Sequence, residues 1–147
     1  MINNSLAKLS LILLLFFVSF NGLSYQKFSI QEMELNGKRY NIEIADTNKR
    51  RRQGLMYRQQ LEKNAGMLFI YSRPGDYRIW MKNTLIPLAV IWLDEQAILI
   101  DKKILYPCRS NNCPVTAASA ASKYILELHP AEFDRFHEGD RLPDILQ

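Results

Sequence analysis

The chain has 147 residues, a formal net charge of +4 and 48% hydrophobic residues. So small a charge demands no polyanionic partner, and we expect no nucleic-acid binding. The length suits one domain that buries its own core, and beyond Phe20 no apolar run is long enough to span a membrane.

The chain begins with the three parts of a secretory signal. A short segment ending in Lys8 precedes an almost wholly apolar run at 9–20, and small residues then allow cleavage after Ser24. An uncleaved anchor is the alternative, but such a run spans only ~18 Å as a helix against a bilayer core of ~30 Å. We therefore expect a signal peptide at 1–24 and one exported β-rich domain at 25–147. It would be periplasmic or secreted, with no transmembrane anchor after cleavage.

The mature chain opens with a hairpin pattern. Residues 27–35 and 38–45 resemble strands, and Asn36-Gly37 between them favours a tight turn with positive φ. Asp46-Thr47 supplies an N-cap for a short helix through the basic run at 49–52. Such a run usually marks a solvated helix face, and the alternative is contact with anionic lipid headgroups or an acidic partner.

The rest of the chain reads as short strands with one more helical turn. Strands are expected at 66–71, 78–82, 88–93, 97–105, 122–129 and 141–146, with a loop at 72–76 and a helical turn at 130–136. Alternation places Tyr124, Leu126 and Leu128 on one face of their strand, and Ile125 and Glu127 on the other. This pattern predicts a mainly β (β-rich α+β) fold, a compact, barrel-like, closed antiparallel sheet with two short helices.

The two cysteines, Cys108 and Cys113, lie in the segment PCRSNNCP. In an oxidising compartment a close pair favours a disulfide, which at this spacing would contribute roughly 2 kcal/mol and pin a loop. The spacing differs from the C-x-x-C of thiol-disulfide oxidoreductases, so a redox function is the weaker interpretation. Zinc would need two more ligands, and the two histidines, His129 and His137, lie well downstream. We predict no metal site there.

Several blocks of unusual composition follow one another in the order RRQGLMYRQQL, GMLFIY, WMKNTLIPLAVIWLD, a Pro-Cys loop and KYILEL. In this order they resemble the family known as domain of unknown function 192, over about residues 34–142. The resemblance implies a small, often exported, β-rich barrel without a settled biochemical role. The family's pattern falls on Arg51, Gly54, Leu55, Met56, Arg58, Leu61, Gly66, Met67, Leu68, Phe69, Trp80, Met81, Asn83, Thr84, Pro87, Leu88 and Glu127.

The chain departs from that pattern at two positions. Ala89 stands where the family commonly has an acidic residue, and Gln53 stands where it commonly has arginine. An activity of relatives that used the acidic group would be absent here.

Five polar or aromatic residues form the candidate ligand-binding site: Arg58, Trp80, Asn83, Thr84 and Glu127. An arginine fork suits carboxylate or phosphate, Asn-Thr adds donors and acceptors, and tryptophan offers a flat wall for a sugar ring or cation. The structural alternative is that Arg58 pairs with an acidic residue such as Glu127, while Asn83 and Thr84 satisfy backbone groups at a strand end.

The leading functional hypothesis is a binding or accessory domain of the cell envelope for a small molecule or envelope component, with no cofactor. One alternative is an envelope hydrolase acting on carbohydrate or peptide through Glu127 or Asp94. Another is a copper-handling protein using Met56, Met67 and Met81, although methionines more often fill gaps in cores. We assign no catalytic residue, because the sequence lacks a Gly-x-Ser-x-Gly elbow, a phosphate-cradling loop and any cofactor fingerprint. Nothing in the pattern specifies an oligomeric state.

Overall fold

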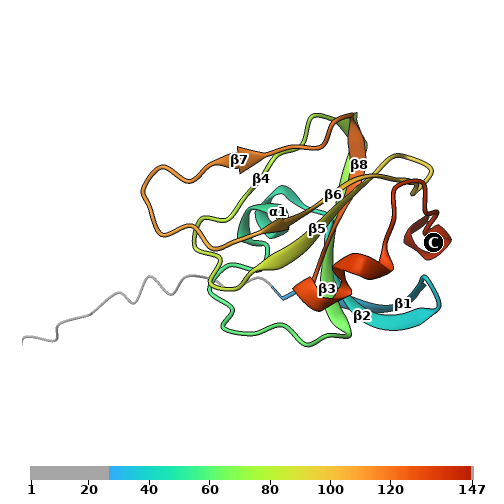
Figure 1. Ribbon diagram of the computed structural model, residues 1–147, viewed down its shortest axis with the longest axis horizontal. Coiled ribbons are helices and arrows are strands. Elements are labelled where there is room, and N and C mark those ends of the chain that lie inside the picture. The colour runs from blue at the N-terminus through green and yellow to red at the C-terminus, as the bar shows by residue number, and fades with distance from the viewer. Residues whose placement is uncertain (1–26, 147) are drawn as a thin grey trace, which may run out of the picture.

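The computed structural model describes residues 27–146, so the predicted signal peptide at 1–24 lies outside the described residues. Eight strands and three short helices follow one another along the chain (Figure 1). They are β1 (Ser29–Leu35), β2 (Lys38–Ala45), α1 (Asn48–Gln53), β3 (Ala65–Gly75), β4 (Ile79–Trp80), β5 (Leu88–Leu93), β6 (Leu99–Leu105), β7 (Val115–Thr116), β8 (Ser122–Leu128) and the 3-10 helices η1 (Pro130–Arg135) and η2 (Pro143–Leu146).

Six strands form the main sheet, in the order β1-β2-β3-β8-β5-β6, and β4 pairs with β7 in a separate ribbon. The β-rich α+β class is thereby confirmed. The closed antiparallel barrel is wrong, since β1 and β6 remain edges of the described sheet and β2 pairs with β3 in parallel. A parallel pair needs a crossover, which α1 and the loop after it provide.

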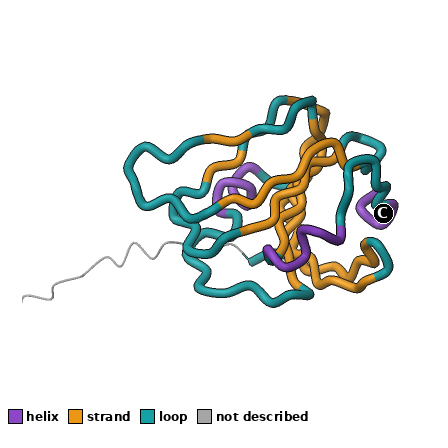
Figure 2. Tube along the Cα trace, viewed as in Figure 1, coloured by secondary structure: helices purple, strands orange, loops and turns teal. Residues whose placement is uncertain are grey.

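The sheet carries an apolar cluster on each of its two faces. All six residues of β5 are buried, so neither face of this strand meets solvent. On one face Tyr124, Leu126 and Leu128 pack beneath the C-terminal segment, whereas Ile125 belongs to the cluster on the other face. Figure 2 shows the helical turns on both sides of the strands, with the long loops gathered on the α1 side.

The predicted N-terminal hairpin and its following helix are confirmed. Asn36 and Gly37 have φ values of 48° and 73°, as a tight turn of this kind requires. The Thr47 hydroxyl accepts the Arg50 N–H at 3.2 Å and caps α1. Gly54 ends α1 with a φ of 48°.

Three predicted elements differ from the structure. The expected loop at 72–76 mostly belongs to β3, whose pairing with β8 shifts between Ile70 and Gly75, where Pro74 has no N–H for the ladder. The expected strand at 78–82 is only the two residues of β4. The expected strand at 141–146 is instead η2 beyond one bridge at Arg141, because Pro143 favours the first turn of a helix.

The 3-10 helix η1 is tied to β2 through the buried Glu132. Its carboxylate accepts from the Tyr40 hydroxyl at 2.6 Å and pairs with the Lys38 ammonium at 2.8 Å. Burial disfavours the ionised form of Glu132 and by itself would raise its pKa. The hydrogen bonds from Lys38 and Tyr40 favour the ionised form more strongly, so the pKa of Glu132 is lowered. These contacts hold η1 against the face of the sheet opposite α1.

The predicted disulfide between Cys108 and Cys113 is present, with Cα atoms 5.7 Å apart. It lies in the loop between β6 and β7, and a bridge joins Cys108 to Lys82 just after β4. The Lys103 ammonium donates to the carbonyl of Ala117, the residue that follows β7, at 2.9 Å and so ties the end of β7 to β6. Within residues 27–146, no helix has the length and apolar character to cross a membrane.

Candidate functional site

A cavity of about 340 Å³, here called the α1 cavity, lies between α1, β4 and the main sheet. Its apolar and aromatic walls include Leu55, Phe69, Tyr71, Ile79 and Trp80, and its polar lining includes Thr84 and Glu127. Gly54 permits this arrangement, since a Cβ there would lie 3.3 Å from the Phe69 ring and φ is positive. The glycine after α1 thus brings the helix close over the sheet.

Glu127 is a buried acidic residue in the lining of this cavity. It lies on the central strand β8 between Met67 of β3 and Val90 of β5, with 4% of its surface exposed. No hydrogen bond to its carboxyl is found among residues 27–146. Burial raises the pKa of Glu127 to about 8, against the opposing effect of the Arg58 charge. At neutral pH the side chain is therefore largely a carboxylic acid, able to donate a hydrogen bond into the cavity.

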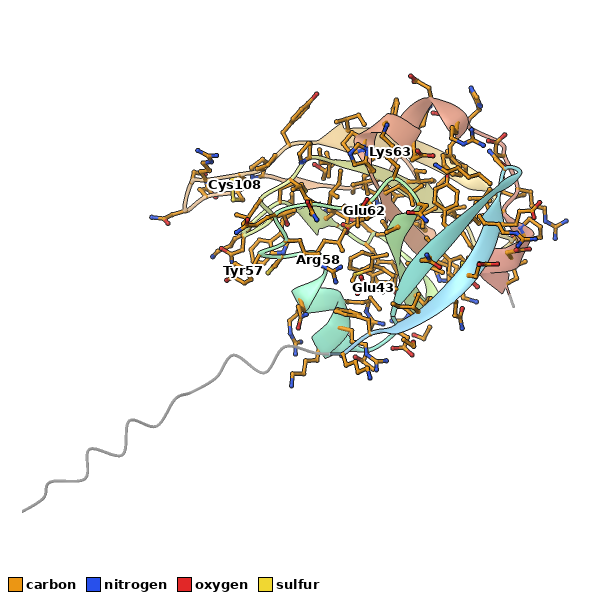
Figure 3. The ribbon with its side chains drawn as sticks, turned by 90° about the horizontal axis from the view of Figure 1, so that it is seen from below. Glu43, Tyr57, Arg58, Glu62, Lys63 and Cys108 are labelled. Atoms are coloured by element: carbon orange, nitrogen blue, oxygen red, sulfur yellow. A yellow bond between two sulfur atoms is a disulfide. The ribbon has the colours of Figure 1, made fainter. Side chains whose placement is uncertain are left out.

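Arg58 forms a bidentate ion pair with Glu43. Its Nη1 and Nη2 atoms lie 2.5 Å and 2.7 Å from the two carboxylate oxygens of Glu43 (Figure 3). Glu43 and Glu127 stand on either side of Met67 in one cross-strand row, so the Arg58 charge acts on both carboxyls. The acidic partner of Arg58 is thus Glu43, and Arg58 is not part of the α1 cavity lining.

The loop after α1 meets the turn after β4. The Tyr57 N–H donates to the Asn83 carbonyl at 2.8 Å, and the Asn83 amide nitrogen lies 4.0 Å from the Met56 sulfur. Tyr57 and Asn83 both have positive φ, at 63° and 59°. The blocks RRQGLMYR and WMKNT, which lie apart in the sequence, therefore come together beside the α1 cavity.

A second cavity of about 440 Å³, the disulfide cavity, adjoins the first. It lies between residues 82–85 and residues 107–111, and includes Cys108 and Arg109. Asn83 lines this cavity, whereas Thr84 lines both. Of the five candidate residues, Trp80, Thr84 and Glu127 thus share the α1 cavity. Asn83 lines only the disulfide cavity, and Arg58 belongs to neither lining.

Three arginines surround the α1 cavity, and the sequence analysis did not place them in the candidate site. Arg51 is fixed, because it donates to the carbonyls of Asp46 and Ile70 and covers the Tyr71 ring at 4.8 Å. Arg78 forms an exposed pair with Asp76, and Arg52 is exposed on α1. The basic run at 49–52 was the sequence feature that could have indicated Arg51 and Arg52. A run of adjacent basic residues does not show whether their side chains face solvent or line a cavity.

Residues of the alternative hypotheses lie in other settings. Asp94 accepts the N–H groups of Gln96 and Ile98 at 2.9 and 2.8 Å in the turn between β5 and β6. Met67 and Met81 are buried in the apolar cluster on the α1 side, whereas Met56 lines the α1 cavity. No group of three or more His, Cys, Asp or Glu side chains suited to a metal ion occurs within residues 27–146.

The fold and cavity define a class: a β-rich α+β domain whose open sheet carries a buried carboxyl beneath an aromatic and arginine-lined rim. More narrowly, the chain belongs to the DUF192 family, described as Uncharacterized ACR, COG1430, whose model matches residues 31–143. Among curated proteins, none matches the chain.

Two solved structures share this fold. One is a Sinorhizobium meliloti 1021 protein named a "putative transcription regulator", with 26% identity and a TM-score of 0.68, covering 80% of this chain and 95% of that one. The other is a protein of unknown function from Novosphingobium aromaticivorans DSM 12444, with 22% identity and a TM-score of 0.64, covering 82% and 87%. The second likeness concerns the fold alone.

Proposed function

We propose that this domain binds a small organic anion with a flat apolar body in the α1 cavity. The observation that carries the proposal is the buried acid Glu127 beneath a wall containing Trp80 and a rim containing Arg52 and Arg78. A volume of about 340 Å³ is at the lower end of the range for ligand pockets, and a few placed polar groups in an apolar lining are typical of them.

Each part of such a ligand has a matching group. The ring of Trp80 suits a planar apolar body, whereas Tyr71 is already stacked on Tyr77 and covered by Arg51. The protonated Glu127 and the Thr84 hydroxyl can donate hydrogen bonds to ligand oxygens. Arg52 and Arg78 can attract a carboxylate or phosphate at the rim, where Arg78 would exchange its exposed pair with Asp76 for the ligand.

Binding is favoured over hydrolysis because, among the described residues 27–146, Glu127 alone contributes a carboxyl to the cavity lining. The neighbouring carboxylate, Glu43, has both oxygens engaged by Arg58, so it is not available as the second member of a carboxylate pair. Ala89, where the family commonly has an acidic residue, packs in the apolar cluster on the opposite face of the sheet. This departure therefore leaves the α1 cavity lining unchanged.

We also infer that the domain acts outside the cytoplasm, in the cell envelope. The signal-like segment at 1–24 and the disulfide between Cys108 and Cys113 support export. The name of the Sinorhizobium meliloti neighbour would suggest a role in transcription. We do not adopt that role, because the net charge is only +4 and α1, at six residues, is too short to serve as a recognition helix.

Nuclear magnetic resonance titration of the chain from Tyr25 tests this function with named probes. Phenyl phosphate and benzoate should shift the Trp80 indole resonance. Inorganic phosphate, which lacks an apolar ring, and benzyl alcohol, which lacks a negative charge, should both bind more weakly. Arg52→Gln should weaken binding of the two anions about tenfold, in line with loss of one charged hydrogen bond. Arg39→Gln, which removes an exposed arginine from β2, is the matched control.

Equal effects of Arg52→Gln and Arg39→Gln, or no shift at Trp80 with either anion, would count against the proposal. The pH supplies a second readout. Anion binding should weaken above about pH 8, where Glu127 ionises, and this dependence should disappear in Glu127→Gln. Mass spectrometry of small molecules retained by protein purified from its own envelope would then identify the natural ligand.

A further inference from the structure

Exposed apolar side chains gather at one end of the molecule. Five of the seven large apolar side chains that are well exposed within residues 27–146 lie in or beside the β4–β7 ribbon: Tyr57 (56%), Trp80 (45%), Leu85 (51%), Tyr106 (70%) and Val115 (54%). The other two, Ile30 and Leu146, lie on β1 and η2. We call the five residues the ribbon patch.

Several members of the ribbon patch lie on neighbouring segments. Trp80 and Val115 are direct partners across the antiparallel ribbon, so their side chains lie on the same face of it. Tyr57 reaches the patch through its hydrogen bond to Asn83, two residues before Leu85. The views agree on this placement: Figure 1 shows the ribbon projecting from the main sheet, and Figure 3 shows Tyr57 and Cys108 toward the same end.

The charges beside the ribbon patch are mostly cationic. The Lys82 ammonium lies 5.4 Å from the centre of the Trp80 ring, and Arg109 follows Tyr106 by three residues. Lys82, Leu85 and Arg109 line the disulfide cavity, and no Asp or Glu of the part of the chain that the structure describes lines it. The surface therefore combines two tyrosines, a tryptophan and two aliphatic tips with cations between them.

We propose that the ribbon patch docks on an anionic lipid membrane surface. Tryptophan and tyrosine favour the headgroup level of a bilayer, where one part of the ring is apolar and another is hydrated. Leu85 and Val115 would enter the acyl boundary, and Lys82 and Arg109 would contact anionic headgroups. The fluid surface of a bilayer can accept apolar side chains that project from separate segments. Its anionic headgroups complement the positive charges of Lys82 and Arg109. This docking goes beyond ligand binding in the α1 cavity and does not depend on it.

Tryptophan fluorescence provides a direct test, because Trp80 is exposed and Trp92, the other tryptophan, is fully buried. The chain from Tyr25 keeps every described strand and both apolar clusters. Vesicles of phosphatidylcholine containing phosphatidylglycerol should shift its emission to the blue, and vesicles of phosphatidylcholine alone should do so much less. The shift should be absent in Trp80→Phe, while co-sedimentation with the anionic vesicles persists.

Matched variants separate the contribution of apolar insertion from that of the positive charges. Leu85→Ser should weaken vesicle binding, whereas Ile30→Ser, at an apolar position outside the patch that is even more exposed (64% against 51%), should not. Lys82→Gln and Arg109→Gln should each reduce the affinity about fivefold, and added salt should do the same. Arg39→Gln is the control for charge. Circular dichroism should show that each variant remains folded.

Three results would overturn the proposal. The first is no blue shift with anionic vesicles, and the second is equal losses in the patch variants and their controls. The third is a dimer in sedimentation experiments that Leu85→Ser abolishes without vesicles present, since the patch would then be an interface between copies of this chain.

Discussion

At the scale of single residues, Glu127 has the least ordinary environment. Its carboxyl lies on a central strand between two apolar neighbours, Met67 and Val90, and only 4% of the residue is exposed. Placing an ionised carboxyl there costs more than burying the neutral acid, so the folded protein retains the proton to about pH 8. A residue of this kind in a cavity is a candidate functional group on physical grounds.

The raised pKa predicts how stability depends on pH. Between the ordinary value of 4.5 and about 8, the folded protein holds a proton at Glu127 that the unfolded chain has lost. The free energy of unfolding therefore falls as the pH rises through this window, on the order of 1 kcal/mol per pH unit. Glu127→Gln should remove this decline, and urea unfolding at pH 5 and pH 8 measures it. Glu138→Gln, at an exposed site, is the control, and an equal decline in wild type and Glu127→Gln would contradict the assignment.

At the scale of elements, β3 and β8 approach each other unusually closely at Gly66. A Cβ added to Gly66 would lie 2.5 Å from a Leu128 methyl carbon and 2.6 Å from the Glu127 carbonyl oxygen. The second of these atoms belongs to the backbone, so a side chain would force the two strands apart. Gly66 thereby sets the position of the strand that presents Glu127 to the α1 cavity.

Gly66→Ala should accordingly lower the free energy of unfolding by about 3 kcal/mol, because overpacking here displaces backbone as well as a side chain. Chemical unfolding measures the loss. Ser72→Ala, at an exposed position further along β3, should change stability little and serves as the control. A loss at Gly66 no larger than at Ser72 would mean that β3 and β8 can separate without cost.

At the scale of the whole molecule, the main sheet and the β4–β7 ribbon differ in how extensively they are held. The main sheet has apolar clusters on both faces. The ribbon pairs over only two residues per strand. It joins the apolar cluster on the α1 side through Ile79, and the Cys108–Cys113 disulfide and the contact of Lys103 with Ala117 hold it further. Its conformation should therefore respond to reduction more than the main sheet does.

Replacing both Cys108 and Cys113 by serine should lower stability by roughly 2 kcal/mol, the entropy that so short a closed loop removes from the unfolded chain. Hydrogen exchange should show the largest acceleration in residues 106–118 and the smallest in β5 and β8. Acceleration in β5 as large as in the loop would show instead that the disulfide supports the main sheet.

Local features could be predicted from the sequence because they depend on residues close together in the chain. Asn36-Gly37 defines a turn, Thr47 caps α1, and alternation in β8 places Glu127 on the face opposite Tyr124. The close cysteine pair likewise predicts its own bond. These parts of the fold required no knowledge of distant contacts.

The tertiary structure decided which distant strands meet. The run LAVIWL in β5 is apolar at every position, so its pattern cannot show that both faces are covered and that the sheet stays open. Nor could the sequence choose Glu43 as the partner of Arg58, or place Arg51 and Arg52 around the α1 cavity. Such pairings follow from burial shared between segments far apart in the chain, and no periodicity within one segment encodes them.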